Sequence, residues 1–290
     1  MRAKAAAPAL AVAAALTAAV VWHGSHGRPP AATPTAPFIV VPRLRPHPAA
    51  KETVLRLPSR LPARSLDLPI LMYHRIDEVK PSLPEITQRL TVAPRVFDAQ
   101  MRWLVRNGFH TVTPLQAFEA LEYHHRLPPR PVLITFDDGY RDVLDKAAPE
   151  LHRLHLHAIE FVITGRTSGP DPSFLTWPEL STLQRLGVSI GSHTVTHRVL
   201  TELPPRQAFA ELRDSRAALQ RHLGHPVQWF AYPFGAVDAS VARMVRRAGY
   251  VLAVTTAGGS EQRGRAPLLL HREEILDTTG VAGFAALLGD

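Results

Sequence analysis

Short apolar segments alternate with amphipathic stretches from about Asp67 to the end of the chain, and this alternation restricts the possible folds more than any other feature. The segment 132–136 is a continuous apolar and β-branched run, which is typical of a strand buried on both faces. The other apolar segments of strand length are 69–73, 159–163, 188–190, 227–230, 251–254 and 268–270. Repeated alternation of strands and helices predicts an α/β fold with a parallel sheet or a barrel.

Three of the intervening stretches have the spacing of amphipathic helices. Apolar residues at positions 97, 101, 104 and 105 fall on one helical face, and Asn107-Gly108 provides a stop signal. Apolar residues at positions 209, 212, 219 and 223 indicate a longer helix. A third helix is predicted from a cap at Asp238 through Ala248, ending at Gly249.

Residues 1–22 have the pattern of an export signal. Arg2 and Lys4 form a short positive region, and residues 5–22 are apolar apart from Thr17. The abundance of alanine favours a cleaved signal peptide, whereas the lack of a clean small-x-small cleavage site after Trp22 favours a retained membrane anchor. Both alternatives predict an exported protein, which is either extracellular or held by residues 5–22 on the outer face of the cytoplasmic membrane.

Residues 23–66 are rich in proline and arginine and show little apolar periodicity. Such a composition cannot bury a core, and it favours extended conformations. We therefore expect a linker over residues 23–66 and a single folded domain over residues 67–290.

The composition excludes several kinds of chemistry. The chain has no cysteine, so disulfides, thiolate metal ligands and cysteine nucleophiles are all excluded. It has 33 Lys and Arg residues against 25 Asp and Glu residues, which gives a formal net charge of +8. Because the arginines are scattered and no basic run alternates with aromatic residues, nucleic acid is not an expected partner.

Two adjacent carboxylates end the apolar run 132–136, in the segment 135–140 with the sequence TFDDGY. The carboxyl ends of parallel strands are where α/β folds place their active sites. Gly139 permits a tight turn, at which Asp137 and Asp138 can serve one site in two roles. An Asp-Asp-Gly sequence alone is more often the cap of a helix, and that alternative stays open at this point.

A pair of histidines, His193 and His197, follows the apolar segment 188–190. Histidines four residues apart lie on one face of a helix, so both imidazoles can reach one metal ion. With 15 histidines in the chain, about one such pair is expected by chance. The position of the pair after a strand favours a metal site, because it directs both side chains to the same end of the fold as Asp137 and Asp138.

Two further segments follow apolar runs. The segment 230–235, with the sequence FAYPFG, contains a proline and a glycine that fix a tight loop whose backbone amides can point into a site. An ordinary strand-to-helix turn has the same signature. His271 follows the run 268–270 and is either a general acid or a histidine at the edge of a strand.

Taken together, these segments resemble the polysaccharide deacetylase family, also called the NodB-homology or carbohydrate esterase family 4 group. Within that family the chain is most similar to the bacterial branch that contains poly-N-acetylglucosamine deacetylases. The matching segments, in the family's order, are PILMYH at 69–74, LITFDDGY at 133–140, GSH at 191–193 with His197, and YPFG at 232–235. The resemblance covers roughly residues 69–288 and implies a distorted (β/α) barrel of the NodB type with fewer than eight strands.

The resemblance also implies the roles of four residues. It implies that Asp138, His193 and His197 bind a divalent metal, and Zn²⁺ is expected for a set of two histidines and one carboxylate with open positions. It implies that Asp137 is the general base. The domain over residues 67–290 is then the catalytic domain.

Five other residues complete the expected site. The backbone amide of Phe234 is expected to stabilise the oxyanion, and His271 is the candidate general acid. Tyr232, Trp177 and His74 are expected to contact substrate, with Trp177 stacking on a sugar face. A core or helix-start position is the alternative for Trp177.

The expected activity is metal-dependent removal of N-acetyl groups from an N-acetylglucosamine-containing polysaccharide. Deacetylation of peptidoglycan, chitin oligomers or acetylxylan is an alternative, and so is a non-catalytic glycan-binding protein on the same scaffold. One departure from the family pattern concerns the base. Many members carry an arginine that pairs with the base aspartate, and Ala231 occupies the aligned position here. We hypothesise that Arg272 supplies the missing charge to Asp137.

Overall fold

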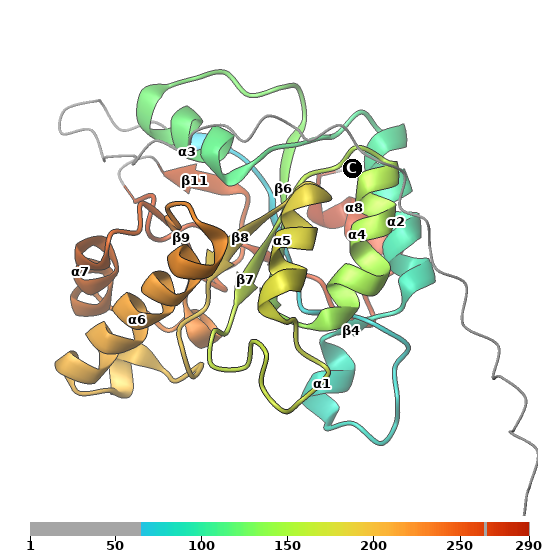
Figure 1. Ribbon diagram of the computed structural model, residues 1–290. Helices are drawn as coiled ribbons and strands as arrows, with labels where there is room; N and C mark the ends of the chain where they lie inside the picture. Colours follow the sequence, from blue (N-terminus) through green and yellow to red (C-terminus); the bar gives the residue numbers. More distant parts are fainter. Residues whose placement is uncertain (1–64, 264–265, 290) are drawn as a thin grey trace, which may run out of the picture. The chain divides into compact units, whose positions relative to one another are not determined.

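The computed structural model describes residues 65–263 and 266–289 (Figure 1). The predicted signal or anchor over residues 1–22 lies outside the described residues, as does nearly all of the predicted linker. β1 (Ser65–Asp67) pairs antiparallel with β11 (Glu261–Arg263), so the predicted boundary after residue 66 falls inside a strand. No helix in the described ranges is both long enough and apolar enough to cross a membrane.

A parallel sheet forms the centre of the domain. Its path runs β10-β9-β8-β7-β6-β2-β12, and β5 pairs with β6 beside this path. All pairings in this sheet are parallel, as the strand–helix alternation predicted. The strands are β2 (Ile70–Tyr73), β5 (His110–Thr111), β6 (Pro131–Asp138), β7 (Ala158–Val162), β8 (Val188–Ser192), β9 (Trp229–Ala231), β10 (Leu252–Val254) and β12 (Glu273–Glu274).

One segment of the chain connects the two ends of this sheet. Leu270 forms a parallel bridge with Val254 at the end of β10. Three residues later the same segment becomes β12, in which Glu273 pairs with Leu71 of β2. The sheet therefore curls into a barrel with seven strands on its path and β5 beside them, and the predicted (β/α) barrel fold is confirmed. The predicted strand 268–270 is reduced to the bridge at Leu270.

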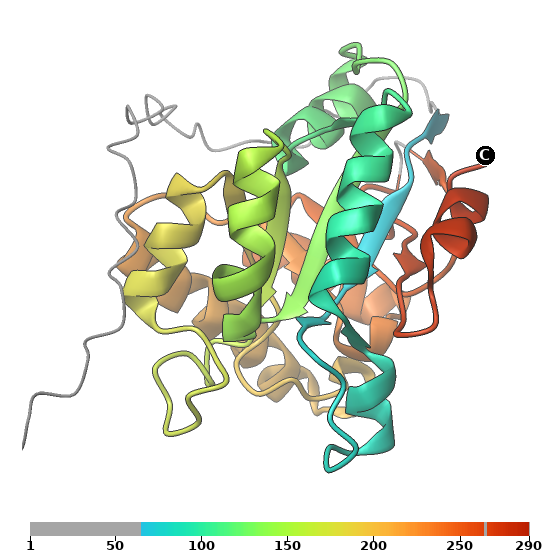
Figure 2. The ribbon, with the colours of Figure 1, turned by 90° about the vertical axis from the view of Figure 1, so that its right-hand side faces the viewer.

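The helices pack around the sheet. Figure 2 shows α2, α4 and α5 side by side across its outer face, while α6 and α7 lie together in Figure 1. The helices are α1 (Glu85–Arg89), α2 (Pro94–Arg106), α3 (Pro114–Tyr123), α4 (Ala148–Arg153), α5 (Trp177–Arg185), α6 (Pro205–Leu223), α7 (Ala239–Ala248) and α8 (Val281–Leu287). Shorter elements are β3 (Arg75–Ile76), β4 (Thr91–Val92), the π-helical η1 (Val143–Ala147), and the 3₁₀ turns η2 (Leu200–Glu202) and η3 (Pro233–Gly235).

The predicted helix boundaries are largely confirmed. Asp238 caps α7 by accepting a hydrogen bond from the amide of Val241, and the helix ends at left-handed Gly249. The predicted apolar face of α2 needs one correction, because Val105 is 45% exposed and Gln100 is buried instead. Gln100 is satisfied there, since its side chain accepts from the Tyr73 hydroxyl and donates to the carbonyl of Thr279.

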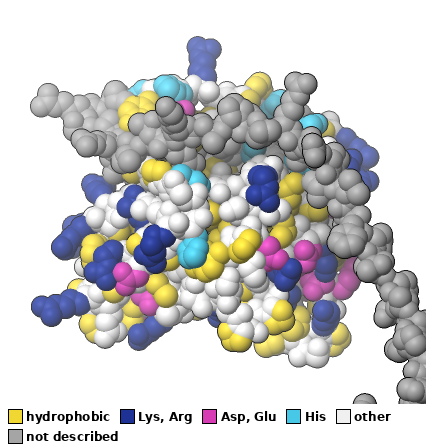
Figure 3. Space-filling view, viewed as in Figure 1, with side chains coloured by type: hydrophobic (Ala, Val, Ile, Leu, Met, Phe, Trp, Pro, Cys, Tyr) yellow, Lys and Arg dark blue, Asp and Glu magenta, His cyan; other side chains and the backbone are white. Residues whose placement is uncertain are grey.

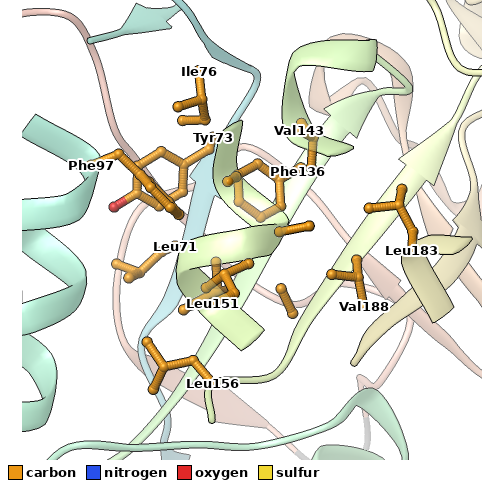
Figure 4. Packing of buried hydrophobic residues seen from close by; sticks show 14 of the residues in the cluster. Leu71, Tyr73, Ile76, Phe97, Phe136, Val143, Leu151, Leu156, Leu183 and Val188 are labelled. Carbon is orange, nitrogen blue, oxygen red and sulfur yellow. The ribbon is translucent and has the colours of Figure 1, made fainter. Parts of the chain in front are cut away.

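Alternation along the strands separates two hydrophobic layers. Leu71, Ile134 and Val188 belong to the outer cluster, which packs beneath α2, α4 and α5. Figure 4 shows Leu71 and Val188 among the side chains of this cluster. Leu133 and Phe161 belong to a second cluster inside the barrel. Because side chains alternate with a period of two, Thr135 and Asp137 share the inner face with Leu133. The polar residues of the site therefore rise directly from an apolar interior.

Close packing inside the barrel requires a glycine in β8. A Cβ atom at Gly191 would lie 2.5 Å from the ring of Phe161. We expect Gly191→Ala to lower the free energy of unfolding by about 1–3 kcal/mol, because the buried ring must shift. Denaturant titration measures this change. Gly283→Ala is the matched control, since a Cβ there meets nothing within 4 Å in α8 and should stabilise by about 0.5–1 kcal/mol. Equal effects of the two substitutions would contradict the packing argument.

Candidate active site

Five of the predicted residues lie where strands of the sheet end. Asp137 and Asp138 end β6, His74 follows β2, and His193 follows β8 and precedes His197. In parallel α/β barrels the carboxyl ends of the strands form the functional face. The strand order of the sheet thus brings together three segments that are far apart in the sequence.

Asp138, His193 and His197 form a cluster of potential metal ligands. The Nε2 atoms of the two histidines are 3.0 Å apart, and Oδ1 of Asp138 lies 3.7 Å from Nε2 of His193 and 3.6 Å from Nε2 of His197. A point equidistant from atoms at these separations lies about 2.0 Å from each, which is the length of zinc–nitrogen and zinc–oxygen bonds. The three donor atoms therefore fit one divalent cation.

The state of the donor atoms also fits a cation. Nδ1 of His193 lies 2.8 Å from the carbonyl oxygen of Ala231, so this nitrogen carries the proton and Nε2 presents its lone pair to the cluster. Burial lowers the pKa of His193 to about 3, which keeps the imidazole neutral. Oδ1 of Asp138 is buried and has no hydrogen-bond partner in the described chain.

The turn after β6 directs the two adjacent carboxylates differently. Asp138 has φ of 80° and Gly139 has φ of 84°, so the chain turns through two left-handed residues. This conformation is strained for an aspartate and favours glycine at the next position. Asp138 is thereby turned toward the histidines, while Asp137 keeps its place on the inner face of the barrel. The structure therefore does not support the alternative in which Asp137 and Asp138 serve only as helix caps.

The histidine pair is held by an irregular loop, which corrects the prediction of a helix. Thr194 and His197 both have positive φ, of 67° and 60°. The carboxylate of Glu211 in α6 accepts hydrogen bonds from the amides of Val195 and Thr196 and from the Thr196 hydroxyl. The loop therefore gains its shape from a distant helix, which the local spacing of the histidines does not reveal.

Asp137 forms a buried, bidentate ion pair with Arg272. Nη1 and Nη2 of Arg272 donate to Oδ1 and Oδ2 of Asp137 at 2.8 and 2.7 Å, and both side chains are almost completely buried. Burial alone would raise the pKa of Asp137, but the charge and hydrogen bonds of Arg272 outweigh burial and hold this pKa well below its usual range. The hypothesis that Arg272 supplies the charge absent at Ala231 is confirmed.

His74 lies within the electrostatic reach of this ion pair. Burial lowers the pKa of His74 to about 4, and the charges of Asp137, Arg272 and His197 act on it as well. Its Nδ1 atom is buried and has no partner in the described chain. The expected placement of His74 at the pocket is consistent with these contacts.

Phe234 lies beside the metal-ligand cluster. Its ring centroid is 4.6 Å from that of His197, and its side chain is 64% exposed. The residue has φ of 57°, and Gly235 follows it with no room for a Cβ atom against Thr256. The loop 232–235 thus holds the ring of this residue beside His197, and the role of its amide stays a prediction.

His271 is not brought to the cluster, although it was the candidate acid. In the parallel register of β12 with β2, Glu273 lies opposite Leu71, so His271 falls level with Pro69 before β2 begins. Gln262 confirms this level, because its side chain donates to the carbonyls of both Leu68 and His271. On its other side the same segment lies at the carboxyl end of β10, where Leu270 bridges Val254. In the described residues no contact joins His271 to Asp138, His193 or His197.

Trp177 and Tyr232 both take part in packing between elements. Trp177 begins α5 and stacks on His222 of α6, with ring centroids 3.9 Å apart. Tyr232 is fully buried among residues of β9, β10, α6 and α7, and packs edge-on against Phe230. Both rings serve packing between elements, which is the alternative reading stated for Trp177.

Glu160 of β7 is a residue that sequence reasoning missed. It is fully buried in the layer outside the sheet, where its Oε1 accepts a hydrogen bond from the amide of Gly139 at 2.8 Å. Burial raises the pKa of Glu160 well above its usual value, and three nearby aspartates add to the effect. The signal in the sequence was a charged residue in the middle of an otherwise apolar strand. Its contact positions the turn that carries Asp138.

Fold and site together define a class of protein, a parallel α/β barrel with a candidate metal centre and a separate ionised carboxylate at the carboxyl ends of its strands. Comparison with known proteins specifies this class further. A family model described as polysaccharide deacetylase matches residues 124–253. The Bacillus subtilis protein named "Putative polysaccharide deacetylase YxkH" is 33% identical over 218 residues, which is 75% of this chain and 74% of that protein.

Two further relatives point the same way. The poly-beta-1,6-N-acetyl-D-glucosamine N-deacetylase of Staphylococcus epidermidis is 25% identical over 199 residues, covering 62% of this chain and 68% of that protein. The structure of the Streptococcus pyogenes deacetylase PplD in complex with acetate superimposes with a TM-score of 0.71 and 29% identity, covering 78% of this chain and 99% of that chain. The chain belongs to the polysaccharide deacetylase family.

Loss of the buried positive charge of Arg272 should affect both the stability of the protein and the pH dependence of its activity. We expect Arg272→Gln to lower the free energy of unfolding by about 3–5 kcal/mol, because Asp137 would keep a buried and unpaired charge. The pKa of Asp137 should rise, so the acidic limb of the pH profile of kcat/KM should move to higher pH. Arg141→Gln is the control, since Arg141 pairs with Glu179 at the surface and should cost less than about 1 kcal/mol. An unchanged pH profile for Arg272→Gln would contradict the assigned role.

The contact of Glu160 with Gly139 predicts different effects of two substitutions. Glu160→Leu should leave the Gly139 amide without an acceptor, which costs about 1–3 kcal/mol and loosens the turn at Asp138. Glu160→Gln keeps an acceptor oxygen at the same place, so its stability and its affinity for Zn²⁺ should match those of the unmodified protein. Denaturant titration and calorimetric titration with Zn²⁺ measure the two consequences. The positioning role is refuted if both variants bind Zn²⁺ as tightly as the unmodified protein.

Proposed function

We propose that this polysaccharide deacetylase is metal-dependent and removes N-acetyl groups from an N-acetylglucosamine-containing polysaccharide. The observation that carries the proposal is the convergence of Asp138, His193 and His197 at ligand distances beside the separate carboxylate of Asp137. The similarity to a poly-beta-1,6-N-acetyl-D-glucosamine N-deacetylase supports the substrate class.

The residues around the cluster suit hydrolysis of an amide. A divalent cation bound there, with Zn²⁺ the best match to the donor set, would polarise the acetyl carbonyl and acidify the attacking water. Asp137 is ionised because Arg272 neutralises its environment, and its Oδ2 atom lies 4.0 Å from Nε2 of His193. It can therefore take the proton from a water molecule placed over the cluster.

His74 is the residue that we assign to proton delivery. It is neutral at rest, because burial lowers its pKa, and the charge of Asp137 acts on it directly. It can carry the proton that Asp137 removes from water to the nitrogen of the departing amine. The carbon–nitrogen bond then breaks, and the products are acetate and the amino sugar. We assign the amide of Phe234 to donate to the oxyanion that forms before this step.

The competing readings differ in what they predict. A non-catalytic glycan-binding protein would not need Asp137 and Arg272 as a buried ion pair beside the cluster, so the geometry favours an enzyme. On the face shown in Figure 3, Lys and Arg side chains are spread out with Asp and Glu among them. Peptidoglycan, chitin oligomers and acetylxylan remain alternative substrates within the same chemistry.

We also propose that the protein acts outside the cytoplasmic membrane. The support is the pattern of residues 1–22, in which a short positive region precedes an apolar run. Fractionation of cells that produce the full chain tests this proposal, and recovery of the protein in the cytoplasm would contradict it.

Acetate release from defined substrates tests the function. Protein stripped with a chelator should be inactive, and added Zn²⁺ should restore release of acetate and of new primary amines from oligomers of N-acetylglucosamine. We expect Asp137→Asn to lower kcat by about 10²–10⁴-fold, which is the usual contribution of a general base. Calorimetric titration should show that this variant still binds Zn²⁺. The proposal would be refuted if zinc-loaded protein released no acetate from poly-N-acetylglucosamine, peptidoglycan, chitin oligomers or acetylxylan.

A further inference from the structure

Four side chains form a continuous stack beside the candidate active site. The rings of Tyr140 and Phe174 stack with centroids 4.8 Å apart, and their backbones form an antiparallel bridge. The guanidinium of Arg75 lies 4.8 Å from the ring of Tyr140, and that of Arg166 lies 4.7 Å from the ring of Phe174. The order of the stack is therefore cation, ring, ring, cation, and Tyr140 is only two residues from Asp138.

The two cations of this stack differ in their partners. Arg75 is neutralised, because its guanidinium pairs with Asp142 at 2.9 Å and with Asp77 at 3.6 Å. Arg166 is exposed, and within the described parts of the chain its guanidinium has neither an ion pair nor a hydrogen bond. Its positive charge is thus available at the surface.

Backbone contacts fix Arg166 next to the loop that carries the histidines. The amides of Thr164 and Gly165 donate to the carbonyls of Thr194 and Val195 at 3.1 and 2.8 Å. The approach is so close that a Cβ atom at Gly165 would lie 2.5 Å from the Val195 carbonyl oxygen. The charge of Arg166 also opposes the effect of burial and of Asp137 on the pKa of Asp138, as expected for a cation near the cluster.

A guanidinium held in this way is prepared for an anion. Stacking on Phe174 restricts the side chain in advance, so binding a ligand costs less conformational entropy than it would for a free arginine. The residue remains exposed, and the planar donor fork of its guanidinium matches the geometry of a carboxylate or a phosphate. Neutral sugar hydroxyls would gain no charge–charge attraction from the Arg166 guanidinium.

We propose that Arg166 is a subsite for an anionic substituent, a carboxylate or a phosphate, on the glycan that this enzyme deacetylates. The inference rests on the proposed function and narrows its substrate class to acidic glycans. The same charge acts on the product, because hydrolysis converts a neutral acetamide into an ammonium group. An exposed arginine repels that ammonium and so weakens the rebinding of glycan that has already been deacetylated.

A matched set of oligosaccharides tests the proposal. All of them contain N-acetylglucosamine. In one the neighbouring sugar carries a carboxylate, in the second this carboxylate is converted to its neutral amide, and in the third the neighbouring sugar carries a phosphate. For the zinc-loaded full chain, we expect kcat/KM for the carboxylate or the phosphate compound to exceed that for the amide by about tenfold or more. The ratio should fall as salt is raised, because the arginine is exposed.

Variants assign the preference to one side chain. Arg166→Gln should bring the ratio of kcat/KM for anionic and neutral compounds close to one, and Arg166→Lys should retain part of it, since a lysine keeps the charge and loses the planar fork. Arg141→Gln is the matched control, because Arg141 lies next to Tyr140 but already pairs with Glu179, and the ratio should persist in it. Preference for carboxylate over phosphate, or the reverse, identifies the source of the anionic group.

The outcomes separate this inference from the proposed function. Acetate release from anionic and neutral compounds with equal kcat/KM overturns the subsite and leaves the deacetylase proposal intact. A preference that survives in Arg166→Gln also overturns it. If no compound yields acetate, calorimetric binding of the carboxylate and amide compounds to the zinc-loaded chain decides, and equal affinities overturn the subsite independently of catalysis.

Discussion

The buried ion pair between Asp137 and Arg272 is the interaction on which the arrangement of the site depends. Two adjacent carboxylates at one strand end repel each other, and both lie in surroundings that disfavour charge. Arg272 reduces this repulsion by neutralising the charge of Asp137, and Asp138 then faces the histidines. Two carboxyl groups that are neighbours in the sequence therefore have different ionisation behaviour. Burial and the charge of Asp137 raise the pKa of Asp138 to about 7, whereas Arg272 holds that of Asp137 low.

The same ion pair links the site to closure of the barrel. Arg272 lies in the segment that connects β10 to β2, and its side chain donates to the carbonyl of Thr255 and to the hydroxyl of Thr135 as well as to Asp137. Thr135 in turn donates to the carbonyl of Leu71. This chain of hydrogen bonds crosses an otherwise apolar interior, where an unsatisfied polar group would be costly. The last strand segment is therefore joined to β6 by side-chain hydrogen bonds of Arg272 and to β2 by its backbone pairing.

Local patterns predicted the elements and the chemistry well, because both depend on residues close together in the chain. The apolar run 132–136 and the cap at Asp238 were visible in the sequence, and the TFDDGY segment carries its turn glycine with it. Predictions failed where a distant partner decides the environment. Spacing suggested a helix for His193 and His197, but Glu211 of another helix shapes that loop. Trp177 and Tyr232 have the chemistry of sugar-binding residues, yet neighbouring helices bury or cover their rings.

The sequence by itself determined the parallel α/β class and identified the candidate metal ligands and the candidate base, since strand and turn signals are local. Tertiary structure alone decided that His74 lies within the electrostatic reach of Asp137. Strand register sets the height of each side chain in the barrel, and it places His74 directly after the carboxyl end of β2. It also decided that Arg272 enters the interior and that Arg166 stays outside on an aromatic stack. Such differences arise from contacts between residues far apart in the chain, which periodicity and composition do not encode.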